Sequence, residues 1–328
     1  MTEMRVLSVL PLPVVPSGMV FARRQIESLE KLGVENRSFF IPSKNLSLLS
    51  AFRSFGKLRK EIRSFKPDII HVHYGLLYAF MAAFSSLRPL VITFQGSDIN
   101  TIRSRSLFRN VYGQILSNLA GLRARILICV SPNLLKNIRW GKNKVIIVPP
   151  GINTEVFREM DREQCRGILG WNREDKVVLF NANNPVVKRL DLAKETLEYL
   201  VKEIPGARLE VLDGTLADDS RIPVLLNASD ALLICSDSEG SPTMVKEALA
   251  CNCPVVGVDV GDVRQRLEGV GRCVVAEKDP LKLAVALRQV VGSGRSADGR
   301  KKLLSDGLSE EETAKKILRI YEQIRAGR

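Results

Sequence analysis

Short apolar runs alternate with amphipathic stretches along the whole chain. In the first half these runs predict strands near residues 5–10, 35–40, 68–72, 90–94, 126–130 and 144–148, with helices between them. The second half repeats the pattern, with strands predicted at 176–181, 208–212, 231–235, 254–258 and 272–275, and helices at 189–203 and 310–325. Such alternation is typical of parallel sheets covered on both faces. The sequence therefore predicts two doubly wound, Rossmann-like α/β domains.

The boundary between the two halves is marked by Pro149, Pro150 and Gly151, which end regular structure. A chain of 328 residues is too long for one compact core. We therefore expect an N-terminal domain of residues 1–149 and a C-terminal domain of residues 150–308.

The segment from Ala231 to Val260 carries the clearest chemical pattern. A buried strand is followed by a turn and then by a helix for which Ser241 is the expected N-cap and Pro242 the first residue. The first free N–H groups of that helix belong to Thr243, Met244 and Val245. They are expected at the carboxyl edge of the sheet, where open α/β folds bind ligands and where a helix start favours phosphate.

Two carboxylates flank this helix start, Glu239 in the turn and Glu247 within the helix. Acceptor-only side chains on both sides of phosphate-binding N–H groups suit a nucleoside diphosphate sugar, which has hydroxyls on both sides of its diphosphate. The alternative interpretation is that Glu239 is a solvated loop residue and Glu247 an exposed helix residue.

Glu239-Gly-Ser-Pro, Glu247-Ala-Leu-Ala-Cys and Pro254-Val-Val together resemble the E-x7-E segment of the retaining glycosyltransferases of family 4. The resemblance implies a GT-B fold, in which two Rossmann-like domains face each other across a cleft and the C-terminal domain binds the donor. It further implies that the last helix, within residues 309–328, packs back onto the N-terminal domain. Glu239 would hold hydroxyls of the transferred sugar, and Glu247 the ribose hydroxyls.

Three other segments resemble the same family. Residues 148–157 look like the segment that leads into the C-terminal domain, and Lys188, followed by Arg189, resembles the lysine that binds the donor diphosphate. A solvated cation is the alternative for Lys188, although the helix dipole disfavours a cation there. Gly18 resembles the glycine of a loop that reaches the donor phosphates, and an ordinary turn is the alternative.

The chain also departs from the family pattern. Asn183 stands where an arginine is usual, so Arg189 is expected to take part of the phosphate neutralisation. Gln95 replaces a histidine near the transferred sugar, and we expect it to hydrogen-bond a sugar hydroxyl instead of acting as a base. Residues 213–227 are expected to lack a helix and strand that help to hold the nucleobase.

The acceptor side is less clearly marked. Asp98 and His73 are candidates there, with a purely structural role as the alternative for His73. No metal is expected, because the six cysteines form no C-x-x-C pair and the chain has only two histidines. The cysteines are expected to be small core residues. No apolar run approaches the roughly 18 residues needed to span a bilayer, and no signal peptide is visible, so a cytoplasmic location is expected.

Charge is unevenly distributed, since residues 1–150 carry 22 Lys and Arg against 7 Asp and Glu. Residues 48–65 form a predicted amphipathic helix with cations outside its apolar stripe. With Arg103, Arg105 and Arg109 these cations could hold the N-terminal domain against an anionic membrane surface. The alternative is that the apolar stripe simply packs on the sheet. No recognition motif for nucleic acid accompanies the basic residues.

The sequence therefore predicts a retaining hexosyltransferase that uses a nucleoside diphosphate sugar and a glycan or lipid-linked acceptor. The alternatives are a nucleotide-sugar epimerase of the same fold and a non-catalytic GT-B subunit that binds a glycan or a partner transferase. Glu239, Glu247 and Lys188 favour catalysis, whereas Gln95 and Asn183 are what a binding-only copy would show.

Overall fold

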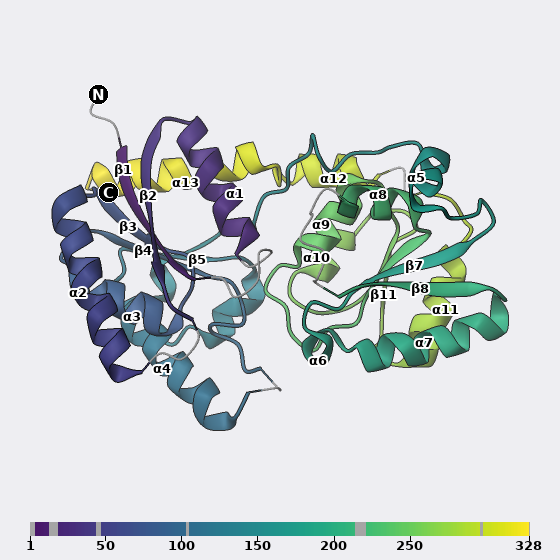
Figure 1. Ribbon diagram of the computed structural model, residues 1–328, viewed down its shortest axis with the longest axis horizontal. Helices are drawn as coiled ribbons and strands as arrows, with labels where there is room; N and C mark the ends of the chain where they lie inside the picture. Colours follow the sequence, from purple (N-terminus) through teal and green to yellow (C-terminus); the bar gives the residue numbers. More distant parts are fainter. Residues whose placement is uncertain are drawn as a thin grey trace. The chain divides into compact units, whose positions relative to one another are not determined.

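The structure is a computed structural model that describes residues 4–12, 19–43, 47–102, 105–213, 221–295 and 298–327. It divides into two units (Figure 1). Unit 1 contains residues 1–151 together with residues 310–328, and unit 2 contains residues 152–309. The two units are connected directly after Gly151 and again before Glu310.

Unit 1 is built on a six-stranded sheet in the order β2-β1-β3-β4-β5-β6, and all its pairings are parallel. The strands are β1 (Met4–Pro11), β2 (Val34–Ile41), β3 (Ile69–Val72), β4 (Leu90–Phe94), β5 (Ile126–Cys129) and β6 (Val145–Ile147). Side chains alternate between the two faces of the sheet, so Leu7 and Val9 enter one apolar cluster while Met4 and Val6 enter another. Both faces must therefore be covered by helices.

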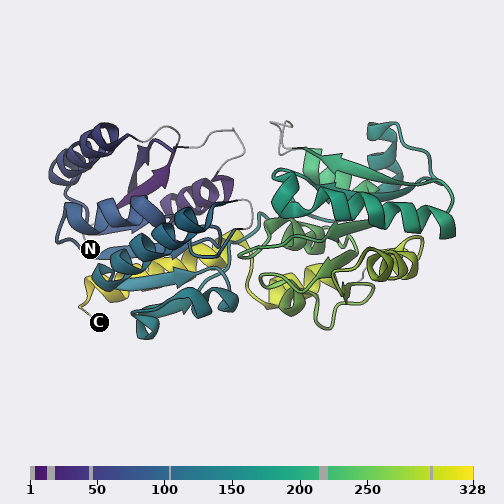
Figure 2. The same ribbon diagram turned by 90° about the horizontal axis from the view of Figure 1, so that it is seen from below.

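The helices of unit 1 cover both faces of this sheet (Figure 2). They are α1 (Val20–Lys31), α2 (Leu48–Phe65), α3 (Leu76–Ser85), α4 (Leu107–Arg123) and α13 (Glu310–Arg325). Two short 3₁₀ turns, Pro132–Asn137 and Lys142–Lys144, complete the unit. Helices α2, α3 and α4 pack on one face, and α1 and α13 pack on the other.

Helix α13 comes from the far end of the chain and completes the core of unit 1. Ala314, Ile317 and Ile320 pack in one cluster with strand residues of the sheet. The hydroxyl of Tyr321 lies 2.5 Å from Nδ1 of His71, and Nε2 of His71 lies 2.7 Å from the hydroxyl of Thr93. Burial lowers the pKa of His71, so this histidine is a neutral hydrogen-bonding group inside the unit.

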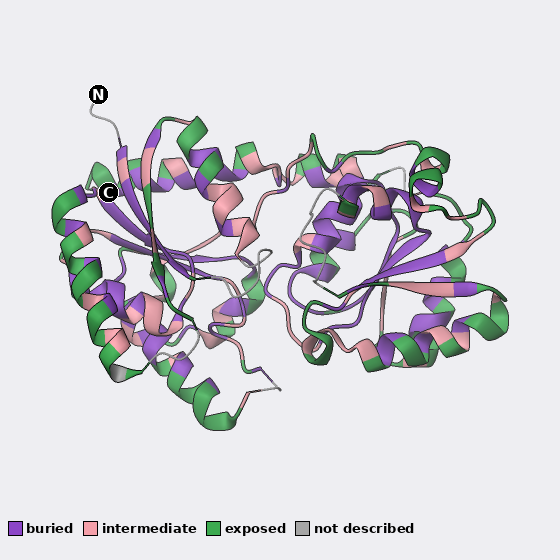
Figure 3. Cartoon of the chain, in the orientation of Figure 1, coloured by how far each residue is buried: buried purple, intermediate pink, exposed green. Residues whose placement is uncertain are grey.

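Unit 2 has a five-stranded sheet in the order β11-β10-β9-β7-β8, again with parallel pairings. Its strands are β7 (Lys176–Asn181), β8 (Ala207–Leu212), β9 (Ala231–Ile234), β10 (Val255–Val258) and β11 (Val274–Ala276). Strands β7, β9 and β10 are largely or completely buried (Figure 3), as expected of apolar runs covered on both faces.

The helices of unit 2 are distributed over both faces of that sheet. They are α5 (Arg162–Leu169), α6 (Pro185–Lys188), α7 (Leu190–Glu203), α8 (Arg221–Ala228), α9 (Thr243–Ala250), α10 (Val263–Leu267), α11 (Pro280–Val290) and α12 (Gly299–Ser305). Helices α7 and α11 pack together, and α9 packs with α12 and α8. Among the described residues no helix has the length and apolarity to cross a membrane.

The prediction of two doubly wound α/β domains is confirmed, and most predicted strand ends lie within two residues of the observed ones. The structure has a helix, α8, at the end of residues 213–227, and residues 214–220 lie outside the described residues, so the expected loss of a helix and strand that hold the nucleobase stays a prediction. One correction concerns the start of α7. Arg189 adopts a left-handed conformation (φ 62°) that separates α6 from α7, so the helix begins at Leu190. All six cysteines are free and five are buried, as expected of core residues.

Candidate functional site

Three loops of unit 2 meet at one edge of its sheet. Strands β7, β9 and β10 are neighbours and run parallel, so the loops that follow them leave from the same side. The loop after β7 leads into α6 and carries Lys188, the loop after β9 carries Glu239, and the loop after β10 carries Asp262. The topology thus brings together side chains that are up to 74 positions apart in the sequence.

Lys188 and Glu239 form an ion pair at the centre of this edge. Nζ of Lys188 lies 2.5 Å from Oε1 of Glu239, and the side chains are 21% and 13% exposed. The hydroxyl of Ser236 donates a second hydrogen bond to the same carboxylate oxygen at 2.8 Å. Lys188 is therefore not the solvated cation of the alternative interpretation, and Glu239 is not a solvated loop residue.

Arg189 lies next to this pair in a second cluster of charges. Its guanidinium donates to Asp191 at 2.8 Å and to Asp237 at 3.3 Å, and Nζ of Lys278 lies 3.2 Å from Asp237. Hydrogen bonds to Asp191 are the largest cause of a raised pKa for Arg189, which stays charged. The backbone N–H of Asp237 donates to the carbonyl of Val187 at 2.8 Å, so the loop after β9 is fixed to α6.

The start of α9 differs from the prediction. Pro242 is the N-cap residue and the helix begins at Thr243, one position later than expected. The Ser241 hydroxyl does not cap the helix, because it donates to Asp262 at 2.8 Å and lies 3.0 Å from Nζ of Lys246. A buried ammonium needs acceptors, and this requirement takes the hydroxyl away from the helix end.

Glu247 and the first turn of α9 are mostly buried at this edge of the unit 2 sheet. Glu247 is 6% exposed, which rules out the exposed helix residue of the alternative interpretation, and Met244 and Val245 are buried as well. Helical geometry leaves the N–H groups of Thr243, Met244 and Val245 without partners inside the helix.

The loop after β10 comes very close to the loop that carries Glu239. A Cβ at Gly261 would lie 2.7 Å from the carbonyl oxygen of Gly240, so only glycine allows this close approach behind Glu239.

Two residues that depart from the family pattern lie in different units, Asn183 in unit 2 and Gln95 in unit 1. Asn183 is exposed in the loop after β7, and its N–H donates to the side chain of Asn181 at 3.0 Å. Gln95 lies in unit 1, half-buried, where its N–H donates to Asp98. Gly18, the predicted phosphate-loop glycine, lies outside the described residues, as does Arg103.

Asp98 and His73, the acceptor-side candidates, are both interior residues of unit 1. Asp98 is 1% exposed and accepts from the N–H groups of Gly75 at 2.7 Å, Gly96 at 2.8 Å and Gln95 at 3.0 Å. His73 is completely buried and stacks on His71, and burial lowers its pKa to about 3. Asp98 thus holds the loops around it from inside the unit, and His73 is a buried neutral residue.

Comparison with known proteins separates the chain into two matching parts. The family described as Glycosyltransferase Family 4 matches residues 19–156, and the family described as Glycosyl transferases group 1 matches residues 191–293. Each of the two parts is thus similar to a family of glycosyltransferases.

Curated relatives match parts of the chain. An N-acetyl-alpha-D-glucosaminyl L-malate synthase of Bacillus anthracis is 25% identical over 61% of the chain and 59% of its own length. A D-inositol 3-phosphate glycosyltransferase of Mycobacterium marinum is 30% identical over 48% of the chain and 39% of its own length. An Escherichia coli UDP-Gal:alpha-D-GlcNAc-diphosphoundecaprenol alpha-1,3-galactosyltransferase is 25% identical over 67% of the chain and 65% of its own length. The chain thus spans less than two thirds of the length of these relatives.

Two solved structures share the GT-B fold. The sucrose-phosphate synthase of Thermosynechococcus elongatus superposes with a TM-score of 0.80 at 15% identity, covering 99% of this chain and 100% of that one. Anabaena HepE, solved with UDP and glucose, superposes with a TM-score of 0.75 at 15% identity over 98% of this chain and 100% of that one. At such identities the likeness concerns the fold alone.

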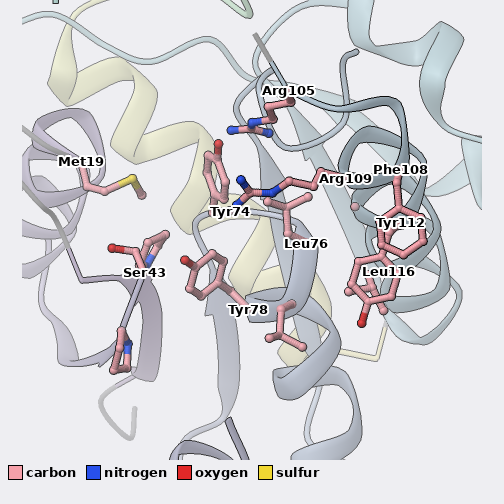
Figure 4. Close-up of a pocket in the computed structure, with 14 residues that line it drawn as sticks. Met19, Ser43, Tyr74, Leu76, Tyr78, Arg105, Phe108, Arg109, Tyr112 and Leu116 are labelled. Carbon is pink, nitrogen blue, oxygen red and sulfur yellow. The ribbon is translucent and has the colours of Figure 1, made fainter. Parts of the chain in front are cut away.

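Unit 1 also contains a cavity. The cavity measures about 610 Å³ and is lined by residues at the end of β1, just after β2 and just before α1, and by residues of α3 and α4 and the loops that precede them. Tyr74, Tyr78, Phe108 and Tyr112 provide aromatic walls, and Arg105 and Arg109 extend toward Tyr74 (Figure 4). Burial raises the pKa of Tyr78 to about 12, so its hydroxyl stays protonated at neutral pH.

Sequence reasoning missed two features of these sites. Lys246 is completely buried, and the signal that could have found it is a lysine inside the mainly apolar sequence of α9. The cavity was also missed. Its signals are two aromatic pairs at helical spacing, Tyr74 with Tyr78 and Phe108 with Tyr112, of which the second flanks Arg109.

Proposed function

We propose that this chain transfers a sugar from a nucleoside diphosphate sugar to a glycan or lipid-linked acceptor, with retention of the anomeric configuration. The observation that carries the proposal is the Lys188–Glu239 ion pair, which stands at the carboxyl edge of the unit 2 sheet with the start of α9. The family assignment of both parts of the chain supports it.

The ion pair suggests how the donor is held. A diphosphate carries more negative charge than one carboxylate, so it competes for the Lys188 ammonium, assisted by Arg189 and by the free N–H groups of Thr243, Met244 and Val245. Glu239, released from the lysine, then accepts hydrogen bonds from hydroxyls of the transferred sugar. In this proposal Glu247 accepts from the ribose hydroxyls.

The proposed chemistry needs no protein base. The bond between the anomeric carbon and the diphosphate oxygen breaks, and the acceptor oxygen bonds to that carbon on the same face. The acceptor proton passes to the leaving diphosphate, whose developing charge Lys188 and the start of α9 stabilise. Gln95 orients a sugar hydroxyl, and no metal takes part in this scheme.

The names of the relatives support the substrate classes. One relative is named for transfer of galactose from UDP-Gal to a GlcNAc-diphosphoundecaprenol, and the HepE structure is titled as a complex with UDP and glucose. We therefore infer a uridine nucleotide donor, a lipid-linked acceptor and a role in polysaccharide biosynthesis for this chain.

A lipid-linked acceptor places the reaction at the inner face of a membrane. On α2, Leu58, Ile62 and Phe65 are buried against the sheet, as the packing interpretation predicted, but Phe52 is 77% exposed. The six cations of this helix and its C-cap are exposed: Arg53, Lys57, Arg59, Lys60, Arg63 and Lys66. Near an anionic leaflet each basic residue contributes about 1 kcal/mol. We expect peripheral, salt-sensitive association.

Donor binding and product chemistry test the proposal. UDP-glucose, UDP-galactose and UDP-N-acetylglucosamine are each added to the purified protein, and a rise in melting temperature reports binding. We expect Glu247→Ala to abolish the rise, and Glu198→Ala, an exposed glutamate on α7, to leave it unchanged. The anomeric configuration of the product is then read by NMR. Unchanged stabilisation in Glu247→Ala, an inverted product, or a donor epimerised without transfer would refute the proposal.

A further inference from the structure

The cavity of unit 1 combines three properties that no role proposed so far explains. It is mostly apolar in lining, it carries the guanidinium groups of Arg105 and Arg109, and of the described residues that line it none is acidic. Arg105 is half-buried and donates to the carbonyl oxygen of Ser97 at 2.6 Å, so its position is fixed, while Arg109 is exposed. Within the described chain no carboxylate pairs with either arginine. The cavity is therefore prepared for an anion.

The backbone beneath the cavity is built to hold a strained shape. Leu76, which lines the cavity, has a left-handed backbone (φ 58°), a conformation that costs a non-glycine residue of order 1–3 kcal/mol. Its N–H donates to the hydroxyl of Ser117 at 2.7 Å, and that hydroxyl donates to the carbonyl of Asp98 at 2.9 Å. Strained backbone fixed by a buried network is concentrated at ligand sites.

One rim of the cavity continues into an exposed apolar face on α4. Phe108 and Tyr112 line the cavity, are stacked with ring centroids 6.1 Å apart, and are 77% and 52% exposed. The same helix exposes Leu107, Val111 and Ile115 by 75%, 45% and 44%. A soluble surface rarely gathers five such residues on one helix unless they meet an apolar partner. The apolar face and the anion-ready cavity share Phe108 and Tyr112.

From this arrangement we infer that the cavity binds the phosphate of a lipid-linked acceptor, with its hydrocarbon chain lying along the exposed face of α4. This inference rests on the proposed function and assigns its acceptor site. Arg105 and Arg109 bind the phosphate oxygens, and Tyr74 and Tyr78 line the space for the sugar attached to them. A free sugar phosphate would leave the face of α4 uncovered, and an uncharged lipid would leave the two arginines without a counter-ion.

The test measures binding of farnesyl diphosphate in the absence of any donor, because this probe has both a diphosphate and a hydrocarbon chain. Dimethylallyl diphosphate lacks most of the chain, and farnesol lacks the charge. We expect the wild type to bind farnesyl diphosphate at least about tenfold more tightly than either, since apolar burial and charge-assisted hydrogen bonds each exceed 1.4 kcal/mol. Dihexanoyl phosphatidylglycerol, a membrane headgroup source, should bind more weakly than farnesyl diphosphate.

Two variants separate the contributions of chain and charge. Phe108→Ser should remove most of the preference for farnesyl over dimethylallyl diphosphate, and Arg109→Ala should remove most of the preference for farnesyl diphosphate over farnesol. Both residues are exposed, so neither change should unfold the protein. Phe84→Ser and Arg88→Ala, at exposed positions of unit 1 outside the cavity, serve as matched controls and should change neither preference.

The outcomes separate this inference from the proposed function. If both preferences survive in Phe108→Ser and Arg109→Ala, if Lys188→Ala abolishes farnesyl diphosphate binding, or if phosphatidylglycerol binds as tightly, the assignment of the cavity is wrong. A protein that binds and cleaves UDP-sugars but not farnesyl diphosphate overturns the inference alone. A protein that binds farnesyl diphosphate but no nucleotide sugar overturns the proposed function alone.

Discussion

The edge site of unit 2 and the cavity region of unit 1 use their carboxylates in opposite ways. In unit 2 the carboxylates of Glu239 and Asp237 neutralise cations, namely Lys188, Arg189 and Lys278. In unit 1 the buried carboxylate of Asp98 accepts three backbone N–H groups, and the arginines of the nearby cavity have no acidic partner among the described residues. An anionic ligand that binds a site whose cations are already paired must replace a carboxylate of the protein. An anionic ligand that binds arginines without an acidic partner replaces nothing.

This difference has a consequence for affinity. In the proposed function a ligand of the unit 2 site displaces Glu239 from Lys188, so part of its binding free energy is used to separate an existing pair. On this proposal the displaced carboxylate would then bind the sugar, so recognition of the diphosphate and recognition of the sugar would be coupled. The unit 1 cavity has no such exchange, and its affinity should follow ionic strength more directly.

The largest effect is expected from Lys188→Met. Loss of the ammonium leaves Glu239 without its cation and removes charge stabilisation of the leaving diphosphate, so kcat/KM should fall about 10²- to 10³-fold. Lys194→Met, at an exposed position on α7, is the control and should behave like the wild type. Steady-state transfer kinetics give the answer. A variant with unchanged kcat/KM would show that the unit 2 pair takes no part in the reaction.

The next largest effect, on stability, is expected from loss of the buried carboxylate of Asp98 in unit 1. Asp98→Ala leaves the buried N–H groups of Gly75 and Gly96, and that of Gln95, without their acceptor, and each loss costs about 1–3 kcal/mol. We expect the free energy of unfolding to fall by about 3–5 kcal/mol in total. Urea denaturation measures it. A loss below about 1 kcal/mol would mean that Asp98 does not brace the loops under the cavity.

Substitution of Lys246 tests how a completely buried cation affects the stability of unit 2. Burial lowers its pKa to about 8, while the unfolded chain has the ordinary value of 10.5. Between these values the unfolded state binds more protons, so wild-type stability should rise with pH across that window. Lys246→Met removes the cost of burying the charge and should stabilise the protein by up to about 3 kcal/mol at pH 7.

The pH dependence supplies the control for this change. The stabilisation by Lys246→Met should fade as the pH rises from 8 to 10.5, because the wild-type lysine is then neutral in the folded state and loses its charge in the unfolded state as well. Lys194→Met should show no such dependence. An advantage that grows over this window would mean that the burial of Lys246 does not lower its pKa.

The smallest effect is expected at Gln95. Gln95→His keeps a hydrogen-bonding side chain, so turnover should change by less than about threefold, whereas Gln95→Ala should lose about fivefold, the value of one neutral hydrogen bond. The comparison is made at saturating donor. A large loss in Gln95→His together with normal activity of Glu239→Gln would reverse the roles proposed for the two residues.

Sequence predicts the fold of this chain well because its signals are local. The strands β4 and β7 end where their apolar runs end, and α11 begins at Pro280 with Asp279 as its N-cap, which is the local sequence signal of a helix start. The turn and helix that carry Glu239 and Glu247 were found for the same reason. A run of apolar residues, a turn and a proline are all visible within one short window.

Long-range contacts set the limit of such prediction. Ser241 has the sequence of an N-cap, but Asp262, 21 positions away, accepts its hydroxyl. The charge of the same distant residue, Asp262, opposes the fall in the pKa of Lys246 that burial causes, and the sequence of α9 does not show this interaction. The unit 1 cavity is lined from segments between Pro11 and Leu116, so only the completed sheet brings its walls together.

The position of α13 has a consequence for biosynthesis. Residues 310–325 fill the second apolar cluster of unit 1, and Tyr321 hydrogen-bonds to His71, yet the ribosome makes them after all of unit 2. During translation one face of the unit 1 sheet remains partly uncovered while unit 2 is synthesised and can fold. Nascent unit 1 is thus the vulnerable intermediate, and a chaperone that shields it would act until the last turns of the chain emerge.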